Sequence, residues 1–203
     1  MEIDIYKTIE SPSEGIYKEK GSKFIAYTYP VYSEEEVKNH LDVLKKEYYD
    51  ARHHCYAYML GEERKVFRAN DDGEPSSSAG KPILGQINSN DLTNIFIVVI
   101  RYFGGTKLGV SGLINAYKTA AAIAIENANI IEKTVNHVYR ISFDYLVMND
   151  VMKILKEDKP EQIGQNFDMM CSIDISMRKN DIDKVIDKLN KITSVKTKHL
   201  RTV

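Results

Sequence analysis

Alternation of apolar and polar positions predicts strands and a helix early in the chain. The stretch GIYKEKGSKFIAYTYPV alternates on both sides of Lys20-Gly21-Ser22, which predicts two strands joined by a tight turn. Ser33 and Glu36 follow with the spacing of a capping box, and apolar residues then recur at helical intervals up to about Tyr48. We therefore expect a helix that packs one apolar stripe against a sheet.

The segment ARHHCYAYML alternates like a strand, so its neighbouring side chains should point to opposite faces of a sheet. His53 and Cys55 would share one face, and His54 would lie on the other. The segment GEER predicts a hairpin turn into KVFRA. Further on, NIFIVVIRYF is apolar enough to be a strand buried on both faces.

The loop NDDGEPSSSAGKP interrupts this pattern with Asp, Ser, Gly and Pro. Loops of this length in compact domains are often functional or mobile. A short helical turn is expected after Pro82, and an alanine-rich helix from about Ser111. These assignments give the first part of the chain a mixed α+β character.

The pattern changes after Asn129. The remaining segments predict the order βαββαβ, which is the split-βαβ, ferredoxin-like arrangement. We place a domain boundary near residue 135, which gives an N-terminal domain over 1–135 and a ferredoxin-like domain over 136–203. The predicted fold class is α+β.

Composition points to an ordinary globular protein. The chain has 203 residues, of which 43% are hydrophobic and 28% charged, and its formal net charge is −1. The chain as a whole is therefore not a polycation, so nucleic-acid binding would need a local basic patch.

Targeting signals and apolar spans are not evident in the sequence. The longest aliphatic runs, IFIVVI and AAAIAI, are far below the roughly 20 residues that cross a bilayer. The start of the chain lacks a basic segment followed by an apolar core, so no secretory signal is expected. With Cys55 and Cys171 as its two thiols, we expect a reduced, cytoplasmic protein without a membrane partner.

The glycine-rich segment RYFGGTKLGVSGLINAY lies between the predicted strand and the alanine-rich helix. It matches neither the Walker loop nor the dinucleotide fingerprint nor the nucleophile elbow. A helix start with unpaired N–H groups, flanked by Arg101 and Lys107, would nevertheless suit a phosphate. Gly104, Gly105 and Gly109 would permit close backbone approach. The competing interpretation is that these glycines serve only a tight strand-to-helix crossing.

Histidines and acids near this segment are candidate ligand contacts. They are His53, His54, Asp72 and Glu74. A metal site is not expected, because His53 and His54 would face apart and no zinc or calcium spacing is present. No cofactor is expected.

Three blocks of the chain resemble the IMPACT/YigZ family, and the bacterial YigZ-type members in particular. They are ARHHCYAYML, DDGEPSSSAGKPIL and VVIRYFGGTKLGVSGLINAY, which occur in the family's order. The resemblance spans roughly residues 14–130. It implies a ribosomal-protein-like βα domain similar to domain four of elongation factor G, followed by a small domain similar to the last domain of that factor.

The resemblance also implies a link to translation control and stress responses. The corresponding surface on this chain would comprise Arg101, Tyr102, Gly104, Gly105, Lys107 and Gly109. The first hypothesis is a non-catalytic module that binds RNA or the ribosome through these residues, with Lys81 and Lys118 as further phosphate contacts. The second is an enzyme with a histidine base and a phosphorylated or nucleotide-like substrate. The third is an adaptor for a protein partner.

Overall fold

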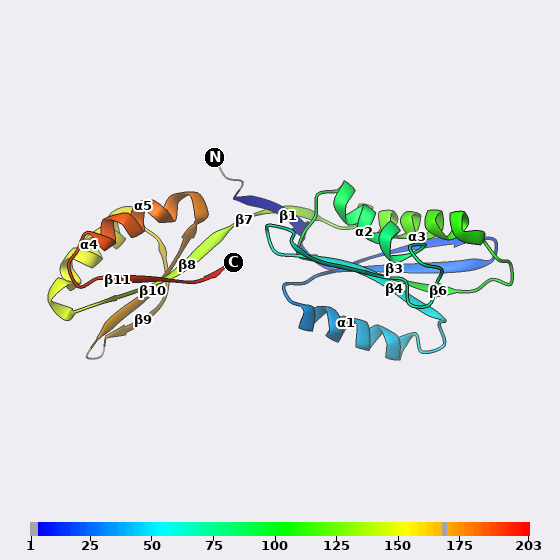
Figure 1. The fold of residues 1–203 in the computed structure, drawn as a ribbon, viewed down its shortest axis with the longest axis horizontal. Helices are drawn as coiled ribbons and strands as arrows, with labels where there is room; N and C mark the ends of the chain where they lie inside the picture. Colours follow the sequence, from blue (N-terminus) through cyan, green and yellow to red (C-terminus); the bar gives the residue numbers. More distant parts are fainter. Residues whose placement is uncertain (1–3, 168–169) are drawn as a thin grey trace. The chain divides into compact units, whose positions relative to one another are not determined.

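The computed structural model describes residues 4–167 and 170–203, which form two compact units (Figure 1). One unit is Tyr6–Lys133. The other is Thr134–Val203 together with Asp4 and Ile5, since Asp4 accepts hydrogen bonds from the Val135 amide and from the Arg178 guanidinium. The boundary predicted from the sequence, near residue 135, lies next to this division. The prediction assigned the start of the chain to the N-terminal domain, whereas Asp4 and Ile5 belong to the other unit.

The first unit contains a five-stranded antiparallel sheet with strand order β2-β3-β6-β4-β5. Its central strand, β6, is buried along nearly its whole length, as its continuous apolar run predicts. The strands are β2 (Ser13–Glu19), β3 (Ser22–Pro30), β4 (His53–Leu60), β5 (Val66–Asn70) and β6 (Ile95–Tyr102).

Helices cover both faces of this sheet (Figure 1). On one face lies α1 (Glu34–Glu47), and on the other lie α2 (Gly80–Ser89) and α3 (Gly109–Glu126). The short helical turn predicted after Pro82 is part of a longer helix, α2, which begins at Gly80. Helix α3 begins at Gly109, whereas the sequence predicted a start near Ser111. Pro82 fits because the amides of a first helical turn have no intrahelical partner.

Alternation along β4 divides its side chains between two cores, as predicted. Cys55, Ala57 and Met59 are buried in the core beneath α2 and α3. Tyr58 and Leu60 are buried in the core beneath α1. The period of two in the sequence therefore determines which face each residue of this strand occupies.

The second unit has the βαββαβ order and an antiparallel sheet with strand order β11-β8-β10-β9. This is the ferredoxin-like arrangement. Apolar side chains of both helices pack in one core with those of β8 and β10. The elements are β8 (Asn136–Phe143), η1 (Tyr145–Val147), α4 (Met148–Asp158), β9 (Glu161–Phe167), β10 (Cys171–Arg178), α5 (Lys179–Asn190) and β11 (Lys196–Thr202).

Strands β1 (Ile5–Ile9) and β7 (Ile130–Thr134) form a separate two-stranded sheet. The α+β fold class predicted from the sequence is confirmed. No helix in the described part of the chain is long and apolar enough to span a membrane.

The N-cap of α1 gives a direct test of the local sequence signal. The Ser33 hydroxyl accepts a hydrogen bond of 3.2 Å from the Glu36 amide. Substitution Ser33→Ala should lower the free energy of unfolding by about 1 kcal/mol, because one amide of the first turn loses its partner. Urea unfolding measures this change. The control is Asn39→Ala, at an exposed position of the same helix, which should be neutral or slightly stabilising.

Candidate functional site

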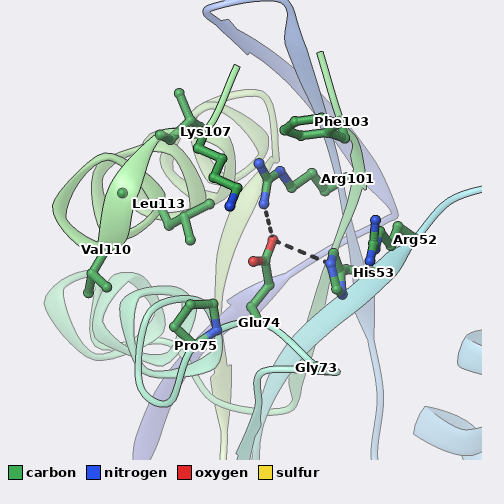
Figure 2. Close-up of a pocket in the computed structure, with 12 residues that line it drawn as sticks. Arg52, His53, Gly73, Glu74, Pro75, Arg101, Phe103, Lys107, Val110 and Leu113 are labelled. Atoms are coloured by element: carbon green, nitrogen blue, oxygen red, sulfur yellow. Dashed lines mark hydrogen bonds and ion pairs between the residues drawn. The ribbon is translucent and has the colours of Figure 1, made fainter. Parts of the chain in front are cut away.

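A pocket of about 460 Å³ lies where β4, β6 and the start of α3 meet the loop after β5 (Figure 2). This volume is within the range of small-molecule sites. The pocket is lined by Arg52, His53, Gly73, Glu74, Pro75, Arg101, Phe103, Lys107, Leu108, Gly109, Val110 and Leu113. Five of the candidates that the sequence suggested therefore share one pocket: His53, Glu74, Arg101, Lys107 and Gly109.

Sheet register brings His53 and Arg101 together. These residues are directly opposite each other in the antiparallel pairing of β4 with β6. Side chains opposite each other on neighbouring strands lie on the same face of a sheet. Both therefore project toward the layer of α2 and α3, although 48 positions separate them in the chain.

The loop before α2 is held by Asp71. Its carboxylate accepts hydrogen bonds from the amides of Ser77 (2.8 Å), Ala79 (3.0 Å) and Gly80 (2.8 Å). These amides lie at or just before the first turn of α2, where backbone donors have no intrahelical partner. Asp71 therefore caps α2 from outside the helix and closes the loop on itself.

Asp72 ties the same loop to β4. Its carboxylate accepts a hydrogen bond of 2.6 Å from the His54 amide. Its carbonyl oxygen lies 2.7 Å from His53 Nδ1, and because a carbonyl only accepts, Nδ1 carries the proton. The backbone then turns through positive φ at Asp72 (41°) and Gly73 (86°), which directs Glu74 into the pocket.

Glu74 and Arg101 form a buried ion pair in this pocket. Arg101 Nη1 donates to Glu74 Oε1 over 2.5 Å, and the two side chains are 8% and 4% exposed. The Tyr117 hydroxyl also donates to Oε1, over 2.9 Å, and His53 Nε2 lies 3.9 Å from the same oxygen. The Arg101 charge is therefore neutralised inside the protein and is not presented to solvent.

Neutral groups continue this network into the core. Cys55 Sγ lies 3.3 Å from the Tyr117 hydroxyl oxygen. Burial raises the pKa of the Tyr117 phenol and the pKa of the Cys55 thiol, so both groups stay protonated at neutral pH. Cys55 is thus not available as a thiolate nucleophile.

Positive charge exceeds negative charge in the pocket lining. Arg52, Arg101 and Lys107 are opposed by one carboxylate, that of Glu74. Lys107 makes no hydrogen bond or ion pair with any residue of 4–167 or 170–203, and both it and Arg52 are exposed. At α3, neither a side-chain cap nor an acidic residue in the first turn offsets the positive end of the helix dipole.

His54 and Tyr102 do not line this pocket. Strand alternation places both on the side of α1, where His54 is 6% exposed and Tyr102 donates a hydrogen bond of 2.8 Å to Asp50. Desolvation by burial lowers the pKa of His54, although the nearby Asp72 carboxylate opposes this shift. His53 is thus the member of the pair that reaches the pocket.

The glycines of the glycine-rich segment between β6 and α3 are required for different structural reasons. A Cβ on Gly104 would lie 1.8 Å from the Gly21 carbonyl carbon, so this position packs directly against the β2–β3 turn. Gly105 (φ 86°) and Gly109 (φ 72°) have open space around a Cβ but adopt positive φ. Gly104 thus matches the tight-crossing interpretation, whereas Gly109 lies in the pocket wall.

The remaining lysine candidates lie on the helices near the pocket. Lys81 is in the first turn of α2, and Lys118 is on α3; both are exposed, and neither belongs to the pocket lining. Across the described residues, no group of three or more His, Cys, Asp or Glu side chains is placed to hold a metal ion.

Sequence reasoning missed several residues of the site. Arg52 and Phe103 immediately adjoin the predicted His53 and Arg101-Tyr102, but no periodic signal distinguishes them. Tyr117 looks like an ordinary apolar helix position, and only its hydroxyl contact with Glu74, 43 residues away, gives it a part in the site. Such contacts depend on the path of the loop, which the sequence pattern does not encode.

Comparison with known proteins identifies relatives across most of the chain. Residues 20–125 match the family model described as the Impact N-terminal domain. "IMPACT family member YvyE" of Bacillus subtilis (strain 168) is 34% identical over 76% of this chain and 71% of its own length. "IMPACT family member YigZ" of Escherichia coli (strain K12) is 29% identical over 78% of each chain.

A solved structure shares the fold over nearly the full length. It is described as "Crystal structure of an hypothetical protein" and covers 98% of this chain and 99% of its own, with a TM-score of 0.76. At 24% sequence identity, this likeness concerns the fold alone.

The close approach at Gly104 predicts a strong stability effect. Substitution Gly104→Ala should lower the free energy of unfolding by about 3 kcal/mol or more, because the new methyl group would overlap the Gly21 backbone. The control is Gly85→Ala in α2, where nothing lies within 4 Å, and a gain of up to about 1 kcal/mol is expected. Equal urea midpoints for the two variants would contradict this interpretation.

Burial of His54 predicts a pH-dependent stability. In the unfolded chain His54 takes up a proton as the pH falls through about 6.5, whereas the folded protein with its lowered pKa stays neutral to lower pH. The unfolded state then binds more protons, so stability should fall below about pH 6.5, by at most about 1.4 kcal/mol per pH unit from this group. Denaturant unfolding at several pH values measures the slope.

The matched variants are His54→Gln and His199→Gln, the latter at an exposed position of the second unit. The first should reduce the slope below pH 6.5, and the second should leave the slope of the first unit unchanged. If the slope is the same in both variants, His54 is not its source.

Proposed function

This chain belongs to the IMPACT family, and from that premise we propose that it is a non-catalytic RNA-binding protein that acts in translation regulation. The family resemblance supports the link to translation. The pocket supports the kind of ligand, because its cations outnumber its single carboxylate at the start of an uncapped helix. The observation that carries the proposal is the exposed Lys107 at this helix start, which has no carboxylate partner among the described residues.

The phosphate contact in this proposal is made by Lys107, by Arg52 and by the first amides of α3. Lys107 immediately precedes the helix, and Gly109 and Val110 line the pocket wall. Arg101 holds Glu74 in place and does not serve as a free cation, because a phosphate would have to compete with a carboxylate at 2.5 Å. Exposed lysines on the same helix layer, Lys81 and Lys118, would contact neighbouring phosphates of the strand.

The alternative of an enzyme with a histidine base has one favourable observation, the 3.9 Å approach of His53 Nε2 to Glu74 Oε1. This distance exceeds hydrogen-bond reach, and Arg101 and Tyr117 already engage that oxygen. The histidine whose pKa is lowered, His54, lies on the other face of the sheet. RNA binding therefore has the better support. Docking of a protein partner is the third hypothesis, and no feature of the pocket selects it.

Substitution Lys107→Ala tests the phosphate contact. A labelled ten-nucleotide single-stranded RNA is titrated with the full chain, and fluorescence anisotropy gives the affinity at several salt concentrations. Loss of one phosphate contact should weaken binding and make the slope of log affinity against log salt shallower by about 0.7.

The control is Lys38→Ala, an exposed lysine on α1 at the opposite face of the sheet. It should keep both the affinity and the salt slope of the unaltered protein. RNA binding that responds equally to the two substitutions would place the contact outside the pocket. Absence of salt-dependent RNA binding in the unaltered protein would reject the proposed function itself.

A further inference from the structure

Glu74 presents one carboxylate oxygen that has no partner within 4–167 and 170–203. All the contacts of this side chain, including both dashed lines in Figure 2, end on Oε1, and Oε2 makes no hydrogen bond with any described residue. The side chain is only 4% exposed and lines the pocket. Oε2 is open to the pocket rather than sealed in the core, so it can accept a hydrogen bond from an N–H group of a ligand.

Arg101 adds an unsatisfied donor on the same side chain that holds Glu74. Its Nε is buried and has no hydrogen-bond partner among the residues that the structure describes. Nε is therefore closed to a ligand, whereas Oε2 of the ion-paired Glu74 is an open acceptor. Such an acceptor complements the N–H donors along the edges of nucleobases.

Phe103 supplies an aromatic face beside this polar pair. Its side chain is 50% exposed, and the Arg101 Cζ lies 5.7 Å from the centre of its ring. The guanidinium that binds Glu74 thus lies over this ring, while half of the residue's surface stays open to a ligand. The neighbouring wall is apolar and contains Pro75, Leu108 and Leu113. Bases stack readily on aromatic side chains of this exposure.

We infer that the pocket receives one nucleotide of the RNA, with its base on Phe103, an N–H of the base on Glu74 Oε2 and its phosphate beside Lys107. This inference rests on the proposed function and specifies its ligand. The carboxylate is essential to it, because Glu74 would repel an inserted phosphate and would attract only the donor edge of a base. A base with an exocyclic amino group, such as adenine, meets this requirement.

Three small probes separate the base from the phosphate. They are adenosine 5′-monophosphate, purine riboside 5′-monophosphate, whose base has no N–H donor, and ribose 5-phosphate, which has no base. Calorimetry with the full chain should give an adenosine monophosphate affinity at least about tenfold above that of the purine analogue, since a hydrogen bond to a charged group is lost in the analogue. The purine analogue should in turn bind at least about fivefold more tightly than ribose 5-phosphate because it still stacks.

Substitution Glu74→Gln tests the donor contact at nearly constant shape. The amide oxygen can still accept from Arg101 and Tyr117, but the group at the free position becomes a donor. Discrimination between adenosine monophosphate and the purine analogue should then fall to about twofold or less. If tenfold discrimination persists in a folded Glu74→Gln variant, the donor contact lies elsewhere and the inference is overturned.

Phe103→Leu keeps the test valid if Glu74→Gln does not fold, because it leaves the buried ion pair intact. It should weaken adenosine monophosphate binding at least about fivefold and leave ribose 5-phosphate binding unchanged. Adenosine monophosphate should also displace the labelled RNA. If RNA binding depends on Lys107 but the three probes bind with equal affinity, the base contact is overturned and the proposed function stands. If the protein does not bind RNA, the proposed function itself is rejected.

Discussion

The buried ion pair between Arg101 and Glu74 is the interaction on which the pocket depends. It joins the end of β6 to a loop 27 positions earlier in the chain, with side chains that are 8% and 4% exposed. Such a pair need not add net stability, but loss of one partner leaves an uncompensated buried charge, at a cost of roughly 3–5 kcal/mol. Each residue thus fixes the other, and the pocket keeps its shape only while both are present.

Three neighbouring acids of the loop have three separate structural roles. Asp71 caps α2, Asp72 accepts from the β4 backbone at His54, and Glu74 pairs with Arg101. The first two bonds hold the loop in position, so Glu74 reaches the pocket in a defined orientation. A stretch whose composition is typical of a mobile loop is therefore organised by its own carboxylates, and Asp72 acts as a support for His53 and His54 rather than as a pocket-lining group.

Local patterns predicted the fold well because strands and helices reflect short-range periodicity. Alternation along β4 correctly separated His53 from His54, and the capping box at Ser33 located the start of α1. Long-range contacts were not predictable in this way. The glycine-rich segment suggested that Arg101 was a free phosphate ligand, yet its partner Glu74 could be recognised only after the β4–β6 register and the loop path were known.

The pocket combines two electrostatic characters that would conflict in a simple anion site. Lys107, Arg52 and the start of α3 favour negative charge, whereas Glu74 disfavours it. Because Arg101 bonds to Glu74 only through Oε1, Oε2 remains as a hydrogen-bond acceptor in the pocket. The surplus positive charge of Lys107 and Arg52 also remains. A ligand complementary to both ends must carry an anionic group and a neutral donor, together with a flat apolar part for Phe103. A nucleotide has these three features in one molecule, and inorganic phosphate has only the first.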